Sequence, residues 1–363
     1  MRIAQVAPLW ESVPPKLYGG TERVVSYLTE ELVRLGHDIT LFASGDSVTA
    51  AKLDAVCPQA LRLNEGIFNR DAPITLLIER AFGSRQHFDL VHSHLDFPAF
   101  PLARRCQTSV VTTIHGRLDL PELVPVYLEF LDQPMVSISH AQRQPLPWAN
   151  WAATVHHGLP RDLYTFHPNS KGYLAFLGRI SPEKCPDQAI RIAKQVGMPL
   201  RIAAKVDPAD RTYFHTQIEP LLDHPLIEFV GEISDAEKND FLGGAYAMLA
   251  PYDWPEPFGL VLIEALACGT PVLAYRRGSI PEIIDDGVTG FVCETIDELA
   301  AAVEKAGALD RRRCRQVFDE RFTVERMATD YLALYEKLIQ AEPAAKSWKV
   351  PAMNGHAEAS QVL

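Results

Sequence analysis

The sequence lacks the features that mark membrane proteins and disulfide-stabilised proteins. No apolar run reaches the roughly 18 residues that a membrane-spanning helix needs. The residues after Met1 have the pattern of a buried strand rather than of a signal peptide. The six cysteines include no CxxC pair, which favours free thiols in a reducing compartment. We therefore expect a cytoplasmic protein without a transmembrane segment.

Positive charge is also scarce. The chain has 35 Lys and Arg against 46 Asp and Glu, a net charge of −11. This balance repels the phosphates of nucleic acid and offers no basic face for anionic lipid. We expect no nucleic-acid partner and no membrane association, whereas a small phosphorylated ligand would need only one local basic pocket. The composition leaves the oligomeric state open.

The sequence does contain an alternation of strands and helices. A strand at 3–7 precedes a helix from Thr21, its predicted N-cap, to Gly36. The alternation restarts after position 160 with a strand at 174–177 and a helix at 186–196. This pattern predicts an α/β protein with two doubly wound parallel sheets.

The domain boundaries follow from the same pattern. We predict a first Rossmann-like domain at 1–160, a second at 161–325, a helix at 326–340 that crosses back to the first domain, and a loose tail at 341–363. His157-Gly158 is the predicted hinge, with the glycine absorbing backbone rotation.

One segment suggests ligand chemistry. Glu256-Pro257-Phe258-Gly259-Leu260 leads into a helix that carries Glu264. A helix N-terminus has free N–H groups that favour anions, and two carboxylates at different depths could accept hydrogen bonds from the hydroxyls of an extended ligand. From spacing alone, an ordinary acidic helix N-terminus with one surface glutamate explains the segment equally well.

Further candidates lie where strands end. Arg179 and Lys184 could neutralise a diphosphate, with Lys205 as a weaker third cation, or could be solvated residues on a turn. Gly19-Gly20 could let backbone approach a phosphate, or form a plain tight turn.

Histidines end two strands of the first domain. His115 ends one of them, where a lone histidine is more often structural than functional. His92 and His94 have no third ligand at the usual spacing, so no metal site is predicted.

Together these motifs resemble the retaining GT-B glycosyltransferase family, which includes sucrose synthases and many bacterial glucosyl- and mannosyltransferases. The resemblance covers about residues 1–335. Within the family, the chain is most similar to the branch of the avilamycin-pathway glucosyltransferase. The matching residues are Tyr18-Gly19-Gly20-Thr21-Glu22, Gly178-Arg179 with Lys184, Gly231-Glu232, His157-Gly158, and Glu256 to Glu264 followed by Gly269-Thr270-Pro271-Val272.

The resemblance implies two Rossmann-like domains facing across a cleft, and transfer of a hexose, glucose first, from UDP-glucose to a hydroxyl of a small acceptor with retention. It implies no cofactor beyond the nucleotide-sugar co-substrate and no metal, the nearest imitation of an acidic metal motif being Asp285-Asp286. The implied catalytic residues are His115, Arg179, Lys184 and Glu256, and the implied donor-binding residues are Gly19, Gly20, Arg179, Lys184, Gly231, Glu256, Pro257, Phe258, Gly259, Leu260 and Glu264.

Three alternatives stay open: a catalytically inactive sugar-nucleotide-binding protein, a GT-B epimerase and a phosphorylase. The acceptor has no readable motif. Trp10, Phe97 and Phe100 could stack on the acceptor or simply pack. Arg117 and Asp119, which lie close to His115 in the sequence, are weaker candidates for the pocket of His115. The run Arg311-Arg312-Arg313 is predicted to be a solvated helix face.

Overall fold

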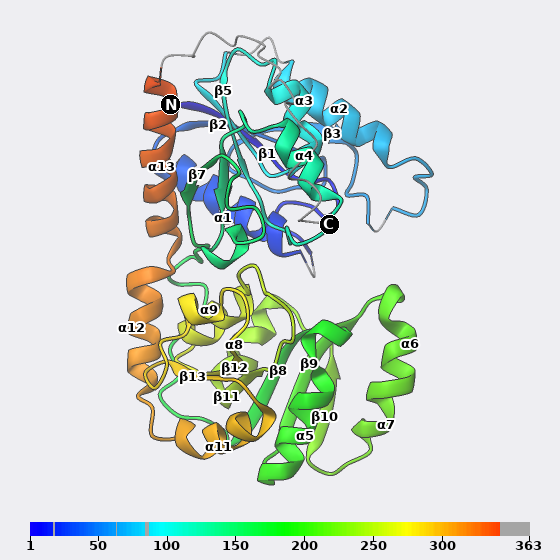
Figure 1. Cartoon of the computed structure of the whole chain (residues 1–363), viewed down its shortest axis with the longest axis vertical. Helices are drawn as coiled ribbons and strands as arrows, with labels where there is room; N and C mark the ends of the chain where they lie inside the picture. Colours follow the sequence, from blue (N-terminus) through cyan, green and yellow to red (C-terminus); the bar gives the residue numbers. More distant parts are fainter. Residues whose placement is uncertain (17–18, 63, 84–86, 342–363) are drawn as a thin grey trace, which may run out of the picture.

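Two α/β lobes lie one above the other in the computed structural model (Figure 1). The structure describes residues 1–341 except 17–18, 63 and 84–86. Tyr18 of the glycine motif and residues 342–363 of the predicted tail lie outside the described residues.

The N-terminal lobe is built on a seven-stranded parallel sheet in the order β3-β2-β1-β4-β5-β6-β7. Its strands are β1 (Arg2–Val6), β2 (Asp38–Ser44), β3 (Lys52–Cys57), β4 (Leu90–Ser93), β5 (Ser109–Thr113), β6 (Met135–Ser137) and β7 (Trp151–Thr154). Its helices are α1 (Gly20–Arg34), α2 (Asp71–Phe82), α3 (Phe100–Ala103) and α4 (Leu123–Glu129), with short 3-10 turns at η1 (Phe97–Ala99) and η2 (Ala141–Arg143).

The C-terminal lobe repeats the plan with a six-stranded parallel sheet in the order β10-β9-β8-β11-β12-β13. Its strands are β8 (Tyr173–Ile180), β9 (Leu200–Val206), β10 (Ile227–Gly231), β11 (Ala245–Ala250), β12 (Val272–Tyr275) and β13 (Gly290–Cys293). Its helices are α5 (Pro186–Val196), α6 (Arg211–Tyr213), α7 (Glu219–Leu222), α8 (Asp235–Gly243), α9 (Leu260–Ala267), α10 (Ile280–Ile283), α11 (Ile296–Ala306) and α12 (Arg311–Arg321), with shorter turns at η3 (Pro182–Lys184), η4 (Pro208–Asp210) and η5 (Phe214–Ile218).

Both sheets are covered by helices, as parallel sheets require. The apolar run of β8 is buried in the centre of the C-terminal sheet, and the amphipathic α1 buries Val24, Leu28 and Leu32 against the N-terminal sheet. The predicted fold class, two doubly wound parallel-sheet domains, is confirmed. The predicted N-cap is wrong in detail, because α1 begins at Gly20 with Gly19 as its N-cap.

The last helix leaves the C-terminal lobe and runs along the N-terminal one (Figure 1). This helix, α13 (Val324–Gln340), buries Met327, Tyr331 and Tyr335 in the same core as Val24 and Leu28 of α1. The chain therefore crosses between the lobes twice.

The two crossings pair with each other. The backbone N–H of Leu159 donates to the Phe322 carbonyl at 2.9 Å, and the N–H of Val324 donates to the Leu159 carbonyl at 2.9 Å. A Cβ at position 158 would lie 2.2 Å from the Thr323 carbonyl oxygen. Gly158 is therefore needed for close backbone contact between the crossings, which is a different reason from the rotational freedom that the sequence suggested.

The structure decides the surroundings of two side chains, Phe100 and Arg311. Phe100 is fully buried between Tyr127 and Phe130, so it cannot stack on an acceptor. Arg311 donates to the carbonyls of His167, Ala245 and Gly243 and to the Thr270 hydroxyl, at 2.7–2.8 Å. It is a structural residue that holds loop carbonyls, not part of a solvated face.

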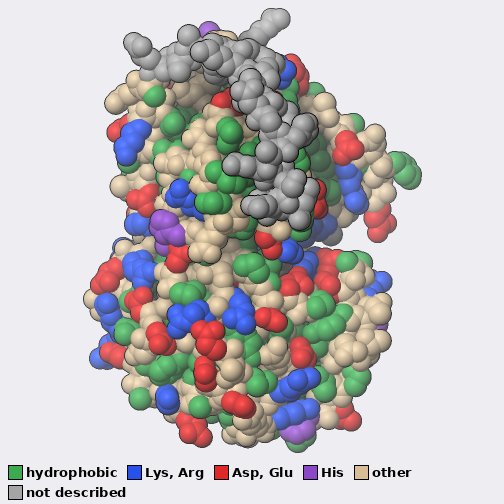
Figure 2. Space-filling model, viewed as in Figure 1, with side chains coloured by type: hydrophobic (Ala, Val, Ile, Leu, Met, Phe, Trp, Pro, Cys, Tyr) green, Lys and Arg blue, Asp and Glu red, His purple; other side chains and the backbone are tan. Residues whose placement is uncertain are grey.

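The surface view shows Lys and Arg interspersed with Asp and Glu over both lobes of this face (Figure 2). Among the described residues, no helix combines the length and the apolar character that crossing a membrane requires.

Candidate active site

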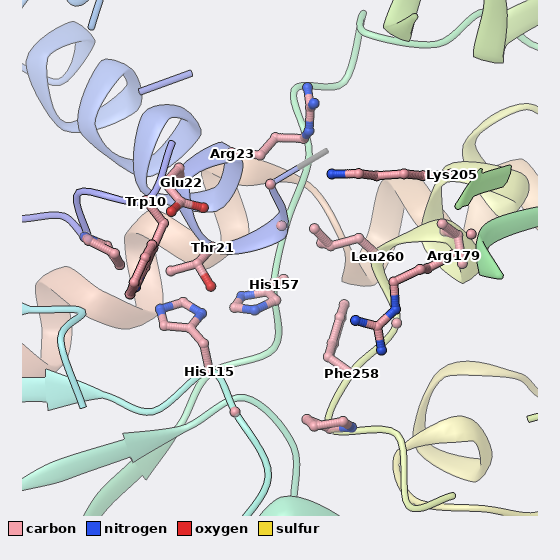
Figure 3. A pocket seen from close by; sticks show the side chains of 18 of the residues that line it. Trp10, Thr21, Glu22, Arg23, His115, His157, Arg179, Lys205, Phe258 and Leu260 are labelled. Carbon is pink, nitrogen blue, oxygen red and sulfur yellow. The ribbon is translucent and has the colours of Figure 1, made fainter. Parts of the chain in front are cut away.

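A cavity of about 920 Å³ lies between the lobes and is lined by both of them. Figure 3 shows side chains of the N-terminal lobe, among them Trp10, Thr21 and His115, facing Arg179 and Leu260 of the C-terminal lobe. Neither lobe encloses this space alone, so a ligand in it would contact both.

The carboxyl ends of β8 and β9 bring two cations into the cavity. Arg179 and Lys205 are register partners in these neighbouring strands, and both line the cavity. Arg179 forms an ion pair with Glu183, and its Nε lies 3.5 Å from an Asp210 carboxylate oxygen. Parallel strand ends that carry cations form an anion site of the kind common in doubly wound sheets.

Lys184 and Glu256 form an ion pair on the same wall. The Trp254 Nε1–H donates to Glu256 Oε2 at 2.9 Å, and the Lys184 ammonium lies 4.1 Å from the centroid of the Tyr252 ring. The two ion-paired side chains are only 15% and 10% exposed. They are thus held in place before any ligand binds.

Glu264 lies deeper in the same wall, with its side chain 2% exposed. Its Oε1 lies 3.2 Å from the Lys238 ammonium, and Lys238 also contacts Asp235 at 3.1 Å. Among the described residues, Glu264 Oε2 has no hydrogen-bond partner. A buried carboxylate oxygen without a partner is costly, so this oxygen is suited to accept a ligand hydroxyl.

Asp235 also links the lobes. It forms an ion pair with Arg23 of α1, whose side chain is 8% exposed. The first turn of α8 therefore contacts the first lobe directly beside Lys238 and Glu264.

The loop before α9 completes this wall. Gly259 is the N-cap of α9 with φ 84°, a left-handed conformation that glycine adopts without strain. Pro257, Gly259 and Leu260 line the cavity at the start of α9, where the N–H of Leu262 donates to the Gly259 carbonyl at 3.0 Å. Phe258 also lines the cavity and packs edge-on against His157, with ring centroids 4.9 Å apart.

The opposite wall carries a group of histidines. His115 follows β5, and its ring stacks on His157 with centroids 5.3 Å apart. The His115 Nε2 lies 2.9 Å from His94 Nδ1. Burial lowers the pKa of His115 to about 3 and lowers the pKa of His94 and His157 well below the usual range. These imidazoles are therefore neutral near pH 7.

Asp96 is a lining residue that the sequence did not indicate. Its backbone has φ 53°, and its Oδ1 accepts a hydrogen bond from the His115 N–H at 3.4 Å. Desolvation raises the pKa of its carboxyl group to about 6. A carboxyl group with such a pKa beside His115 is a common feature of functional sites, but no local motif surrounds it.

Most residues implied by the resemblance meet in this cavity. The lining includes His115, Gly19, Gly20, Arg179, Lys184, Glu256, Pro257, Phe258, Gly259, Leu260 and Glu264. Gly231 does not line it: it ends β10 with φ 77°, and the next residue, Glu232, lines the cavity instead.

The side chains considered for the acceptor and for the pocket of His115 fall into two groups in the structure. Trp10 and Arg117 line the cavity, whereas Phe97 and Asp119 do not. Arg117 forms an ion pair with Asp119 at 2.7 Å.

The Asp285-Asp286 pair, the nearest imitation of an acidic metal motif, contacts protein groups. Asp285 binds Arg321 at 2.8 Å, and Asp286 accepts a hydrogen bond from the Val292 N–H at 2.9 Å. Over the described part of the chain, no group of three or more His, Cys, Asp or Glu side chains is arranged to hold a metal ion.

Comparison with protein families assigns each lobe to a glycosyltransferase model. Residues 18–169 match the model described as Glycosyltransferase Family 4, and residues 165–319 match the model described as Glycosyl transferases group 1. Each lobe matches a glycosyltransferase family, and the chain is a glycosyltransferase. The two matches meet at the crossing between the lobes, so each lobe of the glycosyltransferase corresponds to one of them.

Curated relatives match this glycosyltransferase over most of its length or over a part of it. The D-inositol 3-phosphate glycosyltransferase of Mycolicibacterium smegmatis is 26% identical over 80% of this chain and 81% of the relative. The N-acetyl-alpha-D-glucosaminyl L-malate synthase of Bacillus anthracis is 36% identical over 25% of this chain and 26% of its own length.

Solved structures share the GT-B architecture. A glycosyltransferase of Avilamycin A biosynthesis superposes with a TM-score of 0.70 at 22% identity, covering 94% of this chain and 98% of that one. The sucrose-phosphate synthase of Thermosynechococcus elongatus gives 0.75 at 18% identity, covering 93% and 98%. An Anabaena protein solved in complex with UDP and glucose gives 0.71 at 17% identity, covering 93% and 99%.

Proposed function

We propose that this glycosyltransferase moves a hexose, with glucose as the first candidate, from UDP-glucose to a hydroxyl group of a small acceptor, with retention of the anomeric configuration. One observation carries the proposal: Arg179 and Lys184 lie on the same cavity wall as Glu256 and Glu264. Cations for a diphosphate and carboxylates for hydroxyls are thereby combined in one site.

The charge of the lining supports an anionic donor. Eight Lys or Arg side chains and seven Asp or Glu side chains line the cavity. The chain as a whole has 11 more acidic than basic residues, so the cavity is far less negative than the rest of the molecule. A nucleoside diphosphate sugar, with about two negative charges, fits this local balance.

The two carboxylates are suited to different parts of the donor. Glu264 is the deeper one, and its unpartnered Oε2 would accept a hydrogen bond from a ribose hydroxyl. Glu256, held by Lys184 and Trp254, would accept hydrogen bonds from the transferred sugar. Arg179 and Lys184 would neutralise the diphosphate and the charge that grows on it as it leaves.

The proposed step uses no protein nucleophile. The Glu256 carboxylate is ion-paired and hydrogen-bonded, which weakens it as a nucleophile. The acceptor oxygen would bond to the anomeric carbon on the face from which the phosphate leaves, and the leaving phosphate oxygen would take the acceptor proton. The products are a nucleoside diphosphate and a glycoside, and the residues contribute positioning and electrostatics.

We propose that this step needs no divalent cation, because Arg179, Lys184 and Lys205 provide positive charge where the diphosphate would lie. Turnover should therefore be unchanged in excess chelator. Loss of turnover in chelator, with recovery on adding magnesium or manganese, would contradict this part of the proposal.

The acceptor is proposed to be small and polar. The relatives named above are named for D-inositol 3-phosphate and L-malate, both small hydroxyl compounds. Arg62, Arg117 and Trp10 line the N-terminal side of the cavity, where such an acceptor would bind.

Binding of UDP-glucose without turnover would favour an inactive protein, and release of an isomerised sugar without an acceptor would favour an epimerase.

Calorimetric titration with UDP, GDP and ADP tests the donor assignment, followed by mass spectrometry of incubations with UDP-glucose and a panel of acceptors. We expect Glu264→Gln to weaken UDP binding about tenfold or more, the cost of losing a charge-assisted hydrogen bond. Glu228→Gln, an exposed carboxylate that pairs with Arg201, is the matched control and should bind UDP like the wild type. Equal UDP affinity in all three proteins would refute the assigned role of Glu264.

A further inference from the structure

A buried chain of hydrogen bonds leads away from His115 into the N-terminal lobe. His115 Nε2 lies 2.9 Å from His94 Nδ1, and His94 Nε2 lies 3.0 Å from Gln5 Oε1. The Gln5 amide nitrogen donates to the Tyr335 hydroxyl at 3.4 Å. The chain thus joins a cavity-lining histidine to α13, more than 200 residues away in the sequence.

The chain continues beyond α13. The Tyr335 hydroxyl lies 2.6 Å from His92 Nδ1, and His92 Nε2 lies 2.7 Å from the Thr113 hydroxyl. The Thr113 hydroxyl lies 2.9 Å from that of Tyr331. All of these side chains beyond His115 are at most 2% exposed. In such surroundings each missing hydrogen bond is costly, so the direction of each bond between Tyr335 and His115 constrains the next one.

The directions of these bonds are coupled. A neutral imidazole has one N–H group and one acceptor nitrogen, and a tyrosine hydroxyl has one proton to donate. Because Tyr335 accepts from the Gln5 amide, its own proton goes to His92 Nδ1. Because Gln5 Oε1 is an acceptor, His94 donates from Nε2, and its Nδ1 then accepts from the His115 Nε2–H.

Turning over the Gln5 amide would reverse every bond up to His115. The amide nitrogen would donate to His94, His94 would donate to His115 Nε2, and His115 would carry its proton on Nδ1. The chain therefore has two consistent states, and they differ in whether His115 Nδ1 accepts a hydrogen bond from a ligand or donates one.

We propose that Gln5, His94 and Tyr335 are positioning residues that hold His115 as the Nε2–H tautomer and so leave its Nδ1 as an acceptor toward the cavity. This proposal rests on the proposed function for its consequence, because the partner of that Nδ1 would be a hydroxyl of the transferred sugar. In this way α13, which crosses between the lobes, contributes to the polar support of the site.

Nitrogen NMR of protein with ¹⁵N-labelled histidine tests the proposal directly, since the two tautomers give opposite shifts at Nδ1 and Nε2. The spectrum of a His115→Gln variant assigns the His115 signals. We expect the Nε2–H tautomer in the wild type and a mixture of both in Tyr335→Phe, where the Gln5 amide loses its acceptor and His92 loses its donor. Tyr331→Phe is the matched control: it removes a buried hydroxyl from the same helix but leaves the chain from Thr113 to His115 intact, so the tautomer should not change.

A single Nδ1–H tautomer in the wild type, or an unchanged His115 signal in a folded Tyr335→Phe protein, would overturn the proposal. If Tyr335→Phe fails to fold, Gln5→Met cuts the same chain nearer to His115 with a side chain of similar length, and the same two outcomes apply.

Kinetics separate this inference from the proposed function. In Tyr335→Phe we expect kcat with UDP-glucose to fall about fivefold to tenfold, the effect of one misdirected hydrogen bond, while Tyr331→Phe keeps the wild-type kcat. A tautomer change without any turnover of UDP-glucose in the wild type would refute the proposed donor and leave the tautomer assignment standing. A wild-type tautomer in Tyr335→Phe together with normal turnover would refute the inference and leave the function standing.

Discussion

Lys184 and Glu256 are the residues whose individual roles can be separated most clearly. Because both side chains are largely buried, Lys184→Met leaves the Glu256 carboxylate without its cation, and we expect the free energy of unfolding to fall by about 2–4 kcal/mol. The double variant Lys184→Met with Glu256→Gln removes both charges and should recover most of this stability without recovering turnover. Denaturant titration of the two variants and the wild type, with turnover measured in parallel, checks this. Equal stability of the single variant and the wild type would contradict the ion pair.

Asp96 gives a prediction about pH. Its pKa is raised to about 6 by burial, so the folded protein holds the proton more tightly than the unfolded chain. Ionisation of Asp96 therefore costs stability as the pH rises from about 4 through 6. Asp96→Asn should raise the free energy of unfolding by about 1–3 kcal/mol at pH 7.5 and change it little at pH 4.

Asp89→Asn is the control with the opposite sign. The pKa of Asp89 is lowered by hydrogen bonds from Arg2, so this carboxylate stabilises the folded state at neutral pH and the variant should be less stable at pH 7.5. Urea titrations at both pH values compare the two variants. If Asp96→Asn lowered the free energy of unfolding at pH 7.5, the ionised Asp96 carboxylate would not destabilise the folded protein, which would contradict the prediction.

At the residue scale, sequence reasoning reached the lining groups that belong to a local motif. Glu256 and Glu264 were candidates because they lie just before and within one helix, and the resemblance rather than their spacing implied that they bind the donor. Asp96 was missed because no pattern surrounds it, and the His94–Gln5 contact joins positions 89 residues apart. For Phe100 the sequence left stacking and packing open, because burial depends on packing partners that the sequence does not reveal.

At the scale of elements, the crossing between the lobes depends on one glycine. Gly158→Ala would place a Cβ 2.2 Å from the Thr323 carbonyl oxygen, so the paired crossings must separate. We expect a loss of at least about 2 kcal/mol in the free energy of unfolding, in the range of overpacked sites. Gly116→Ala is the matched control, because nothing lies within 4 Å of its added Cβ. Similar thermal denaturation of the two variants would contradict the close contact.

Elements were predicted well where the apolar pattern is strong. The helix at Pro186–Val196 was predicted with its observed bounds, and the strand predicted at 174–177 lies within β8. The start of α1 was not, because Gly19 caps it without any side-chain hydrogen bond and Thr21 lies inside the first turn.

At the scale of the whole molecule, the lobes are joined across the cavity by the ion pair of Arg23 with Asp235. We expect Arg23→Ala to increase the radius of gyration of the ligand-free protein in small-angle scattering, and UDP to reduce it again by bridging the lobes. Arg34→Ala, on the same helix but ion-paired with Glu31 of that helix, should scatter like the wild type. If Arg23→Ala and the wild type have the same radius with and without UDP, this ion pair does not control closure.

The central claim is that the cavity between the lobes binds a nucleoside diphosphate sugar and activates it for transfer. Release of UDP from UDP-glucose by wild type, Arg179→Ala and Arg201→Ala tests it most directly. The Arg179 and Arg201 side chains are both 34% exposed and both pair with carboxylates, but only Arg179 lines the cavity. We predict a roughly hundredfold lower rate for Arg179→Ala, the loss of about 3 kcal/mol of stabilisation of the leaving diphosphate, and a wild-type rate for Arg201→Ala. Equal rates in all three proteins would contradict the claim.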